Sequence, residues 1–357
     1  MAQHKLGIIG FGGMGKHHLN HIREEIGRVE VKGVYDIKEE KQKLAAEEFG
    51  LIAYESAEAL LADAEIDIVL VSTPNNFHKY YSIMALEAGK NVICEKPVMM
   101  NSKELEEVMA VAEKTGKVFT VHQNRRWDRD YLIVKRELAN GKIGKPFFIE
   151  SRVQGARGIP GDWRCTKVAG GGMMLDWGVH LIDQLLTLID SPVCEVYAQV
   201  LNIKYQNPEN DVDDNLKVYL KFKNGVCASV EVGTYNMLTL PRWYVCADNG
   251  TLLIKDWSSG ADIVYAKDVE MQWEQSIIYT AAGPTRTMAP RPKETVEEAH
   301  IDIDEKKSVY LYYENVLDTI EGKAELIVKP SQAMRSMKVM EAAFKSSNEG
   351  ICVKDEI

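Results

Sequence analysis

The segment 170–183 carries the residues with the clearest potential for chemistry in this sequence. Three glycines end a loop there, and an apolar helical pattern follows from Leu175 to Ile189. With 3.6 residues per turn, the polar side chains of this helix fall on one narrow stripe, formed by Asp176, His180, Asp183 and Thr187. Burying a carboxylate or an imidazole is unfavourable unless the group is paired. The stripe therefore predicts either a satisfied pair of core residues or an acid–base site with His180 as the proton acceptor.

Lys96 is the second candidate for chemistry, because it lies between Glu95 and a proline directly after an apolar strand pattern. A lysine in a cleft can hold a substrate oxygen and stabilise the negative charge that develops on it. The alternative is a surface lysine paired with Glu95, but the position at the end of a strand favours the functional interpretation. Asp176 could orient His180 or bind substrate, and Asp183 could do the same from the other side. The spacing alone does not choose between the two acids.

The elements that would position these groups begin with a glycine-rich turn. An apolar run leads into Gly10-Phe11-Gly12-Gly13-Met14-Gly15, which fits G-x-G-x-x-G, and a helical pattern follows it. The glycines of such a motif allow a tight turn, backbone access to a pyrophosphate and close packing of helix on strand. The N-terminus of the helix then faces the diphosphate. The strand before the motif and the helix after it indicate a dinucleotide cofactor.

Asp36 ends the second expected strand, 21 residues beyond Gly15. An acid at this distance binds the adenosine ribose hydroxyls and repels a 2′-phosphate, so NAD is favoured over NADP. Lys38 and Lys41 lie close enough to keep NADP as the second choice. Asp36 could also cap the helix expected over residues 37–49, and both roles could hold together.

The first third of the chain alternates between strand and helix patterns. Strands are expected at 5–10, 30–35, 66–71, 91–94 and 118–121, and helices at 37–49, 56–62, 78–88 and 102–115. This alternation is typical of a doubly wound parallel sheet, whose ligands bind beyond the carboxyl ends of the strands. We therefore expect the segments 73–78, 95–97 and 122–127 to line one cleft.

A different pattern begins after residue 127. A helix is expected at 128–139, followed by strands at 146–154, 193–203, 216–222, 226–232, 243–247 and 251–254. Asn224-Gly225 and Asn249-Gly250 predict hairpin turns, so the second sheet is expected to be mostly antiparallel with helices on one side. The segment 283–292 carries three prolines and predicts an exposed loop or arm, and helices near 308–320 and 331–345 follow it.

These patterns predict an α/β protein of two domains. Residues 1–122 form a nucleotide-binding Rossmann domain, and residues 123–357 form a second α/β domain. The helix at 331–345 is a candidate to pack back toward the first domain. A chain of 357 residues is long for one core and comfortable for two.

Composition excludes several other classes of protein. The chain is 45% hydrophobic and 27% charged with a net charge of −10, and it shows no basic stripe, so neither nucleic acid nor an anionic membrane is expected as a partner. We find no targeting pattern and no apolar run of about 18 residues, so a cytoplasmic protein is expected. The six cysteines are scattered without a C-x-x-C motif and indicate neither a disulfide framework nor a metal site.

Four motifs together resemble one known family. Gly10-x-Gly12-x-x-Gly15, Thr73-Pro74-Asn75-x-x-His78, Glu95-Lys96-Pro97 and Gly171-Gly172-x-x-x-Asp176-x-Gly178-x-His180-x-x-Asp183 occur in order. The sequence is similar to the Gfo/Idh/MocA oxidoreductases, which include glucose–fructose oxidoreductase and inositol dehydrogenase, over essentially the whole chain. The run 122–127 resembles the branch with scyllo-inositol and glycoside or sugar 3-dehydrogenases.

The resemblance implies a fold, a substrate class and a set of catalytic residues. It implies a Rossmann domain followed by an α/β domain with an open-faced sheet that often forms the interface of a homodimer or homotetramer. The implied substrate is a sugar, glycoside or cyclitol, and the implied catalytic set is Lys96, Asp176 and His180. In the mechanism expected from it, His180 removes the proton of a ring hydroxyl while the neighbouring carbon gives a hydride to NAD. Lys96 holds the oxygen, and Asp176 fixes His180 or a second hydroxyl.

Other residues are expected to border the cofactor or the substrate. Ser72, Thr73, Pro74, Asn75, His78, Glu95 and Gln123 are expected beside the cofactor, and Arg126, Trp127, Trp163 and Arg164 beside the substrate. Asn75 and His78 could instead form and cap a turn, and Trp127 beside Arg126 could be ordinary packing. Trp163 could stack on a sugar ring with Arg164 on its hydroxyls, or the two could anchor a loop.

Two other functions compete with a dehydrogenase. A redox-assisted lyase or glycosidase would oxidise a sugar carbon to acidify its neighbour and would keep its NAD bound, so net release of NADH distinguishes it. A sensor would keep the dinucleotide fold without the chemistry. The presence of Lys96, Asp176 and His180 together argues against a sensor, whereas the fold alone would not.

Overall fold

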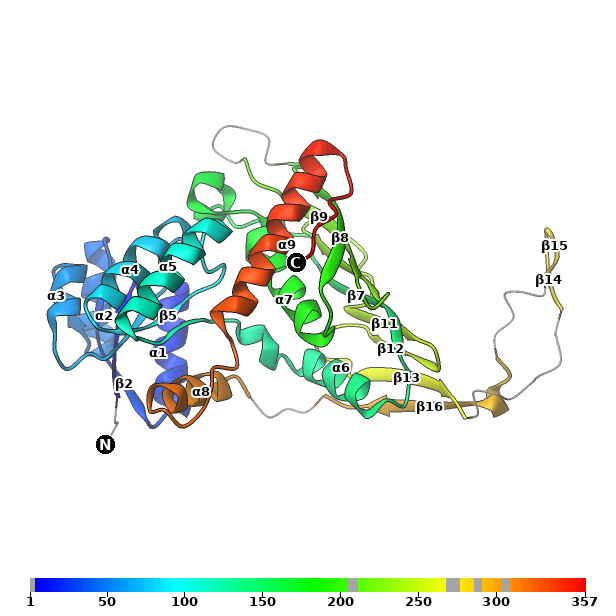
Figure 1. Ribbon diagram of the computed structural model, residues 1–357, viewed down its shortest axis with the longest axis horizontal. Coiled ribbons are helices and arrows are strands. Elements are labelled where there is room, and N and C mark those ends of the chain that lie inside the picture. The colour runs from blue at the N-terminus through cyan, green and yellow to red at the C-terminus, as the bar shows by residue number, and fades with distance from the viewer. Residues whose placement is uncertain (1–3, 205–210, 268–276, 286–290, 304–307) are drawn as a thin grey trace.

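The computed structural model describes residues 4–204, 211–267, 277–285, 291–303 and 308–357. Its body consists of two large sheets with helices packed around and between them (Figure 1). The N-terminal sheet carries the glycine-rich turn, and the C-terminal sheet carries the helix with His180. The two halves meet where the sequence places its candidate catalytic residues.

The N-terminal sheet has six parallel strands in the order β3-β2-β1-β4-β5-β6. The strands are β1 His4–Ile9, β2 Val29–Tyr35, β3 Ile52–Ala53, β4 Ile68–Val71, β5 Asn91–Cys94 and β6 Phe119–Val121. The helices between them are α1 Gly13–Glu25, α2 Glu39–Phe49, α3 Ala57–Ala62, α4 His78–Glu87 and α5 Ser102–Thr115. The predicted doubly wound sheet is confirmed. Only β3 was not predicted, because it is a two-residue edge strand with exposed side chains.

The sheet order reverses direction between β1 and β4, since β1 pairs with β2 on one side and with β4 on the other. In open α/β sheets, a crevice forms at the carboxyl ends of the strands at such a switch point. The glycine-rich turn follows β1 there, the segment 72–78 follows β4, and the segment 95–97 follows β5.

The C-terminal sheet has eight strands in the order β16-β13-β12-β11-β7-β10-β9-β8. They are β7 Pro146–Gln154, β8 Val193–Leu201, β9 Asn215–Phe222, β10 Cys227–Gly233, β11 Trp243–Ala247, β12 Gly250–Ile254, β13 Ala261–Ala266 and β16 Val296–Ile301. Only the β7–β10 pair is parallel, which confirms the predicted mostly antiparallel sheet. The two Asn-Gly turns join β9 to β10 and β11 to β12, as predicted. The strands β13 and β16 were not predicted. The central residues of β16 are exposed and include two glutamates, so its sequence lacks the pattern of a half-buried strand.

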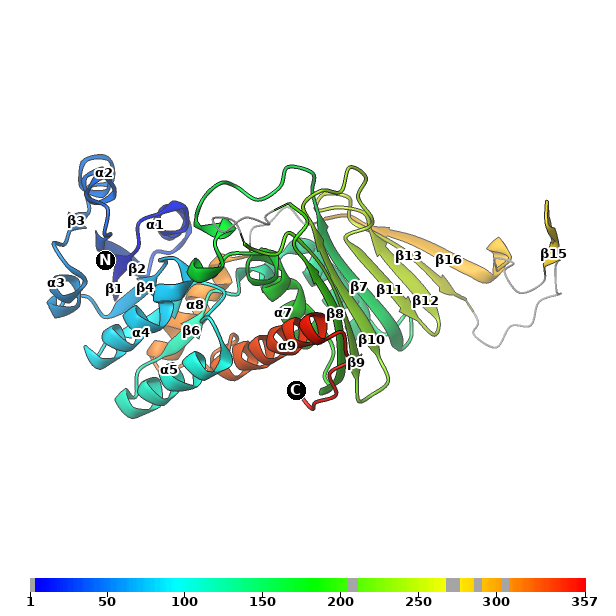
Figure 2. The same cartoon turned by 90° about the horizontal axis from the view of Figure 1, so that it is seen from above.

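Helices cover one face of this second sheet, and no helix of the described residues covers the other (Figure 2). The helices of this half are α6 Arg129–Asn140, α7 Val179–Leu188, α8 Tyr310–Ile320 and α9 Pro330–Glu349. Helix α9 packs against α7 and β8 of the second half and against α5 and β6 of the first. Helix α8 lies beside α1. The last two helices thus connect the C-terminal part of the chain to both sheets.

A short hairpin projects from the body beyond the edge of the second sheet (Figures 1 and 2). It is formed by β14 Ile278–Thr280 and β15 Gly283–Thr285. The predicted loop or arm at 283–292 begins in this hairpin, and its residues 286–290 lie outside the described part of the chain.

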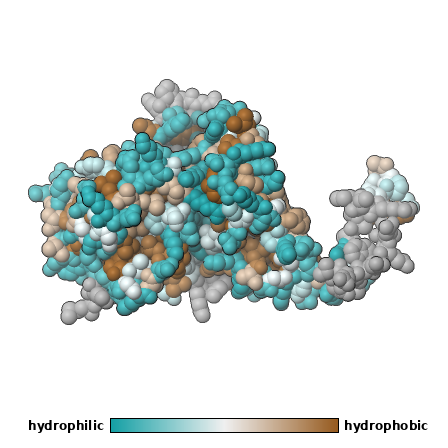
Figure 3. Space-filling model, viewed as in Figure 1, coloured by the Kyte–Doolittle hydropathy of each residue, from teal (hydrophilic) through white to brown (hydrophobic). Residues whose placement is uncertain are grey.

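Hydrophilic residues cover most of the face seen in Figure 3, and hydrophobic ones gather in small patches rather than one continuous band. Among the described residues, we find no helix with both the length and the apolar character needed to cross a membrane.

Arg126 joins three elements at the junction between the halves. It lies in the 3-10 helix Asn124–Trp127 after β6, and its guanidinium donates two parallel hydrogen bonds to Asp183 of α7, at 2.7 and 2.6 Å. Its Nη1 also donates to the Ile327 carbonyl at 3.0 Å and to Gln332 Oε1 at 2.8 Å, at the start of α9. Both partners of the ion pair are buried. The pair therefore fixes η2 (Asn124–Trp127), α7 and α9 relative to one another.

We predict that Asp183→Asn destabilises the protein by roughly 3–5 kcal/mol, because it leaves the Arg126 guanidinium buried without its counter-charge. Urea unfolding followed by tryptophan fluorescence measures the change. The matched control is Asp190→Asn just beyond the same helix, where the side chain is exposed and the change should stay within about 0.5 kcal/mol. Equal stability of the two variants would contradict the structural role given to the pair.

Candidate active site

The glycine-rich turn opens into a large cavity at the N-terminus of α1. Gly10 has φ +95°, and a Cβ there would lie 2.7 Å from the backbone of Ser72, while a Cβ on Gly15 would lie 2.5 Å from the Gly10 carbonyl oxygen. A Cβ on Gly12 or Gly13 would meet nothing within 4 Å. The two outer glycines therefore serve the tight turn and the helix packing. The two middle ones leave open space in front of a helix end that has no side-chain cap.

This open helix N-terminus fits the diphosphate of a dinucleotide. The first N–H groups of a helix have no partner within the helix, and its dipole favours an anion there. The side chain of Phe11 is fully buried and does not line the cavity, whereas Met14 does. The backbone of the turn, rather than the Phe11 side chain, is what the cavity presents.

Asp36 lies at one end of the cavity, at the carboxyl end of β2. Its Oδ2 accepts the Phe11 N–H at 2.7 Å and its Oδ1 accepts the Lys38 N–H at 2.9 Å. Lys38, and not Asp36, is the residue at the helix cap position of α2. Asp36 thus ties the glycine-rich turn to the second strand. Lys38 and Lys41 line the same end of the cavity.

The cavity has a volume of about 640 Å³ and runs between the two halves of the chain. The three expected segments, 73–78, 95–97 and 122–127, all contribute residues to its lining, as does the glycine-rich turn. Of the predicted site residues, those that line it are Gly10, Gly12, Gly13, Met14, Asp36, Ser72, Thr73, Pro74, Asn75, Glu95, Lys96, Trp163, Arg164, Asp176 and His180.

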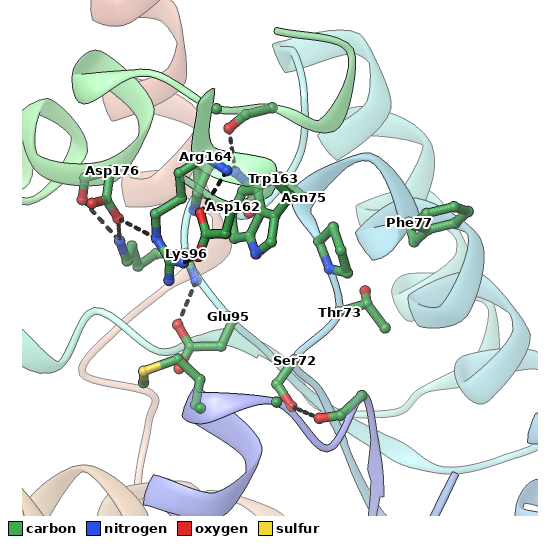
Figure 4. Close-up of a pocket in the computed structure, with 18 of the residues that line it drawn as sticks. Ser72, Thr73, Asn75, Phe77, Glu95, Lys96, Asp162, Trp163, Arg164 and Asp176 are labelled. Atoms are coloured by element: carbon green, nitrogen blue, oxygen red, sulfur yellow. Dashed lines mark hydrogen bonds and ion pairs between the residues drawn. The ribbon is translucent and has the colours of Figure 1, made fainter. Parts of the chain in front are cut away.

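Lys96 follows β5, which β1 and β4 separate from β2 and Asp36 in the sheet. Lys96 meets Asp176 in the cavity (Figure 4). The Lys96 ammonium donates to Asp176 Oδ1 and to the Asp176 carbonyl oxygen, both at 2.8 Å. Arg164 lies 4.0 Å from the same carboxylate. Burial alone would raise the pKa of Asp176, but Lys96 and then Arg164 hold it below its usual value. Since an ammonium has three donors, Lys96 keeps one N–H for a substrate oxygen.

His180 lines the same end of the cavity. Its Nδ1 is buried with no hydrogen-bond partner among the described residues. Burial, followed by the positive charges of Lys96 and Arg125, holds the pKa of His180 well below its usual value. The imidazole is therefore unprotonated at neutral pH and is in the form that accepts a proton.

The predicted polar stripe on the helix does not form as expected. Residues Met174–Gly178 are a π-helix, and the α-helix begins only at Val179. The extra residue in the π-turn shifts Asp176 relative to the residues that follow. As a result, Asp176 pairs with Lys96 and not with His180, and Asp183 pairs with Arg126. Neither acid orients the imidazole through a hydrogen bond.

The arginine that lines the cavity is Arg125 and not Arg126. Arg126 and Trp127 are buried away from the cavity, so the structure corrects the expectation that they contact substrate. Adjacent residues of a 3-10 helix point about 120° apart, so only one of the two arginines can face the site. The Arg125 guanidinium stacks on Trp177, 4.1 Å from the ring centroid. Arg125 and Trp177 are site residues that the sequence did not single out.

His78 and Gln123, expected beside the cofactor, are buried and are not among the residues that line the cavity. His78 is fully buried, with Nδ1 2.9 Å from the Pro97 carbonyl oxygen and Nε2 3.0 Å from that of Thr73, so it joins the loops after β4 and β5. Gln123 is buried and does not line the cavity. Sequence patterns identified these loops but not which side chains turn inward.

Asn75 joins the two halves beside the cavity. Its Nδ2 donates to the Gly170 carbonyl at 2.6 Å, and a Cβ on Gly170 would lie 2.6 Å from Asn75 Cβ. The glycine at position 170 therefore permits close contact between the loop after β4 and the loop that precedes the π-helix. Both interpretations of Asn75 fit, since it lines the cavity and also holds a loop.

Trp163 and Arg164 make contacts within their own loop and also line the cavity. The Arg164 guanidinium lies 4.7 Å from the Trp163 ring centroid and donates to Asp162 at 2.6 Å, which anchors the loop. Both residues also line the cavity beside Asp176 (Figure 4).

A buried network that the sequence did not predict lies behind Lys96. Glu95 Oε1 accepts hydrogen bonds from His18 of α1 at 2.6 Å and from His122 at 2.9 Å. Ligand atoms of these three residues lie within 4.8 Å of one another, and such donors can hold a metal. The two nitrogens are at hydrogen-bonding distance from one oxygen, so the geometry is that of a hydrogen-bond network.

The arrangement suits transfer of a hydride with a coupled proton. One end of the cavity offers an open helix N-terminus and the carboxylate of Asp36. The other offers a neutral imidazole beside an ammonium held in place by a carboxylate. Aromatic faces at Trp163 and Trp177 line the same end and suit the apolar faces of a ring substrate.

Comparison with known proteins agrees with both halves of this description. Residues 4–123 match the model of the oxidoreductase family with an NAD-binding Rossmann fold, GFO_IDH_MocA, and residues 131–253 match the GFO/IDH/MocA C-terminal domain. The crystal structure of an NAD-binding protein from Listeria innocua is 43% identical, covers 99% of this chain and 100% of that one, and has a TM-score of 0.92.

Two relatives with assigned activities are more distant. The scyllo-inositol 2-dehydrogenase (NADP(+)) IolW of Bacillus subtilis is 23% identical over 97% of this chain and 94% of its own. The D-glucoside 3-dehydrogenase of Escherichia coli is 30% identical over 46% of this chain and 48% of its own. With the fold, the site geometry and the family matches in agreement, this chain belongs to the Gfo/Idh/MocA family of oxidoreductases, with an NAD-binding Rossmann fold.

Proposed function

We propose that this protein is an NAD-dependent dehydrogenase that oxidises a ring hydroxyl of a sugar, glycoside or inositol, or reduces the corresponding ketone. The observation that carries the proposal is the placement of Lys96, Asp176 and His180 at one end of a cavity whose other end holds Asp36. The inositol and glucoside dehydrogenases among the relatives support the substrate class.

The residues that line the cavity would have different roles in binding and in the reaction. Gly12 and Gly13 would receive the diphosphate, and Asp36 the adenosine ribose. A bound nicotinamide would supply the hydride acceptor. His180 accepts the hydroxyl proton, and the free N–H of Lys96 donates to the same oxygen as it becomes a carbonyl.

Asp176 positions Lys96 rather than His180. The carboxylate and the carbonyl oxygen of Asp176 take two of the three N–H groups of the ammonium, which leaves the third in a defined direction. In the reverse direction, Lys96 polarises the carbonyl and a protonated His180 returns the proton.

We predict that Lys96→Met and His180→Ala each lower kcat for alcohol oxidation by about 10²- to 10⁴-fold, because each removes a group that acts on the reacting oxygen. NADH absorbance, with NAD and a panel of inositols, hexoses, glucosides and sugar acids, measures the rate. Lys103→Met on the exposed face of α5 is the control and should keep the wild-type rate. Unchanged turnover in both site variants would refute the mechanism.

The same panel of substrates also tests the two competing functions, a redox-assisted lyase or glycosidase and a sensor. Product formed from a glycoside without net NADH would support an enzyme that retains its NAD. Nucleotide binding without turnover on any substrate would support a sensor.

Asp36→Ser is expected to shift cofactor choice toward NADP, since the serine no longer repels a 2′-phosphate and Lys38 and Lys41 line the same end of the cavity. We expect the ratio of kcat/KM for NAD to that for NADP to fall by about 10-fold or more, which corresponds to roughly 1.4 kcal/mol. Glu40→Ser, exposed on α2, should leave the ratio unchanged. A wild-type enzyme that already prefers NADP would contradict the role given to Asp36.

Arg125→Met is expected to move the acid limb of the pH profile for alcohol oxidation to higher pH. The positive charge of Arg125 helps to lower the pKa of His180, so its removal raises that pKa. With a higher pKa, His180 becomes protonated at a higher pH, and the rate on the acid side therefore begins to fall at a higher pH. Profiles of kcat/KM for wild type, Arg125→Met and the exposed Arg157→Met test this, and only the first variant should shift. A shift to lower pH would show that His180 is not the titrating base.

A further inference from the structure

A second cavity adjoins the first, and the reaction outlined above does not use it. It has a volume of about 320 Å³, at the lower end of the range for sites that hold a small molecule. Asn124 lines both cavities, so they meet at η2. From the same stretch of chain, Arg125 lines the first cavity and Asp128 lines the second. The two cavities are therefore neighbouring compartments that share part of one wall.

A row of three rings leads from the proton acceptor to the second cavity. The centroid of the His180 ring lies 6.1 Å from that of Trp177, and the centroid of Trp177 lies 6.0 Å from that of Trp257. His180 and Trp177 line the first cavity, whereas Trp257 lines the second. The row therefore crosses the border between the two cavities, and it begins at the group that would accept the hydroxyl proton.

Trp257 reaches this border from the turn between β12 and β13. The turn is held by its own side chains, since Ser259 Oγ accepts the N–H groups of Lys255 and Asp256, both at 3.1 Å. One contact of the indole is structural, because the guanidinium of the buried Arg242 lies 4.6 Å from its ring centroid. The residue is nevertheless 44% exposed. A partly open aromatic surface thus lines the second cavity, and covering it with a ligand would be favourable.

Arg125 holds the two indoles and a carboxylate next to one another. Its guanidinium lies 4.1 Å from the ring centroid of Trp177 and 5.3 Å from that of Trp257. Its Nη1 also donates to Asp128 Oδ2 at 3.0 Å. Since a carboxylate accepts several hydrogen bonds, Asp128 can also accept one from a hydroxyl in the second cavity. The border therefore offers an aromatic platform beside a hydrogen-bond acceptor.

The lining of the second cavity combines aromatic rings with polar groups that bind hydroxyls. The rings are those of Trp127 and Trp257, and the polar groups include the Asp128 carboxylate and the imidazoles of His17 and His21 on α1. A sugar ring offers C–H faces to an indole and hydroxyls to carboxylates and imidazoles. An alkyl chain would desolvate these polar groups without offering them hydrogen bonds, which is costly. The lining therefore favours a sugar ring over an apolar group.

We propose that the second cavity binds the second sugar ring of a disaccharide, and that Trp257 selects such a substrate. The inference rests on the proposed function and narrows its substrate class to two linked sugar rings. The oxidised ring lies at Lys96 and His180 in the first cavity, and the other ring lies on Trp257. The reaction is unchanged: the ring carbon gives its hydride to NAD, and the hydroxyl gives its proton to His180. Contacts with the second ring, remote from the reacting carbon, raise kcat/KM.

Initial rates of NADH formation by the full-length protein with NAD test the proposal. The single-ring probes are glucose, the methyl α- and β-glucosides and myo-inositol, and the two-ring probes are maltose, cellobiose and lactose. We expect kcat/KM for at least one disaccharide to exceed that for every single-ring probe by about 10-fold or more, which corresponds to roughly 1.4 kcal/mol.

Trp257→Ala removes the aromatic platform from the second cavity. It should lower kcat/KM for the preferred disaccharide by about 10-fold and keep the values for the single-ring probes within about twofold of wild type, because only the second ring contacts this indole. Trp257→Phe keeps an aromatic face and should retain most of the preference. Lys255→Ala in the same turn is the matched control, since this side chain is 68% exposed and lines neither cavity. Both kinds of substrate should keep their wild-type rates in it.

Three other results would overturn the proposal. An equal loss for single-ring and two-ring substrates in Trp257→Ala would show that the indole only supports Trp177 and Arg125. The wild-type rates decide the question if that variant does not fold: oxidation of a single-ring probe, with no disaccharide oxidised better, overturns the inference and leaves the dehydrogenase assignment intact. NADH from none of the probes would contradict the proposed function itself, and the inference with it.

Discussion

The ion pair between Lys96 and Asp176 is the interaction on which the rest of the site depends. Lys96 follows a strand of the first sheet, and Asp176 lies in the π-helix that packs against the second. Both side chains are largely buried, so each charge needs the other. Their pairing therefore requires the two halves of the chain to meet in one arrangement. The same constraint acts at the buried Arg126–Asp183 pair, which joins η2 to α7.

The π-turn between the glycines and α7 is what makes the pair possible. Asp213, from the segment before β9, accepts the Met174 N–H at 2.6 Å and so caps the start of this turn. Gly172 has φ +101°, and a Cβ there would lie 2.2 Å from Asp213 Oδ1. The glycine thus lets the carboxylate approach the start of the turn. With the turn held in this way, Asp176 reaches Lys96. His180 stays in the cavity, and its Nδ1 has no carboxylate as a hydrogen-bond partner among the described residues.

At the end of the cavity that holds His180, the charges are arranged so that the imidazole remains neutral. Burial and two nearby cations disfavour protonation of His180, and the cations are kept in place by their own carboxylates. Behind them, Glu95 is held by two histidines and one backbone N–H. The network reaches Tyr313 on α8, so a helix near the C-terminus supports a residue at the carboxyl end of β5. The hydrogen bond between His18 and Tyr313 thus joins α8 to α1.

The sequence by itself determined the architecture and the catalytic candidates. Periodicity predicted the parallel sheet, the glycine-rich turn and the Asn-Gly hairpins, because these depend on local patterns of burial and on turn chemistry. The motifs also identified Lys96, Asp176 and His180. Only the tertiary structure decided which side chains face the cavity. It placed Arg125 rather than Arg126 in the lining of the cavity, buried His78 and Gln123 outside that lining, and joined His18 to Glu95 and Tyr313. These outcomes depend on the π-turn and on contacts between residues far apart in the chain, which a period of 3.6 residues does not encode.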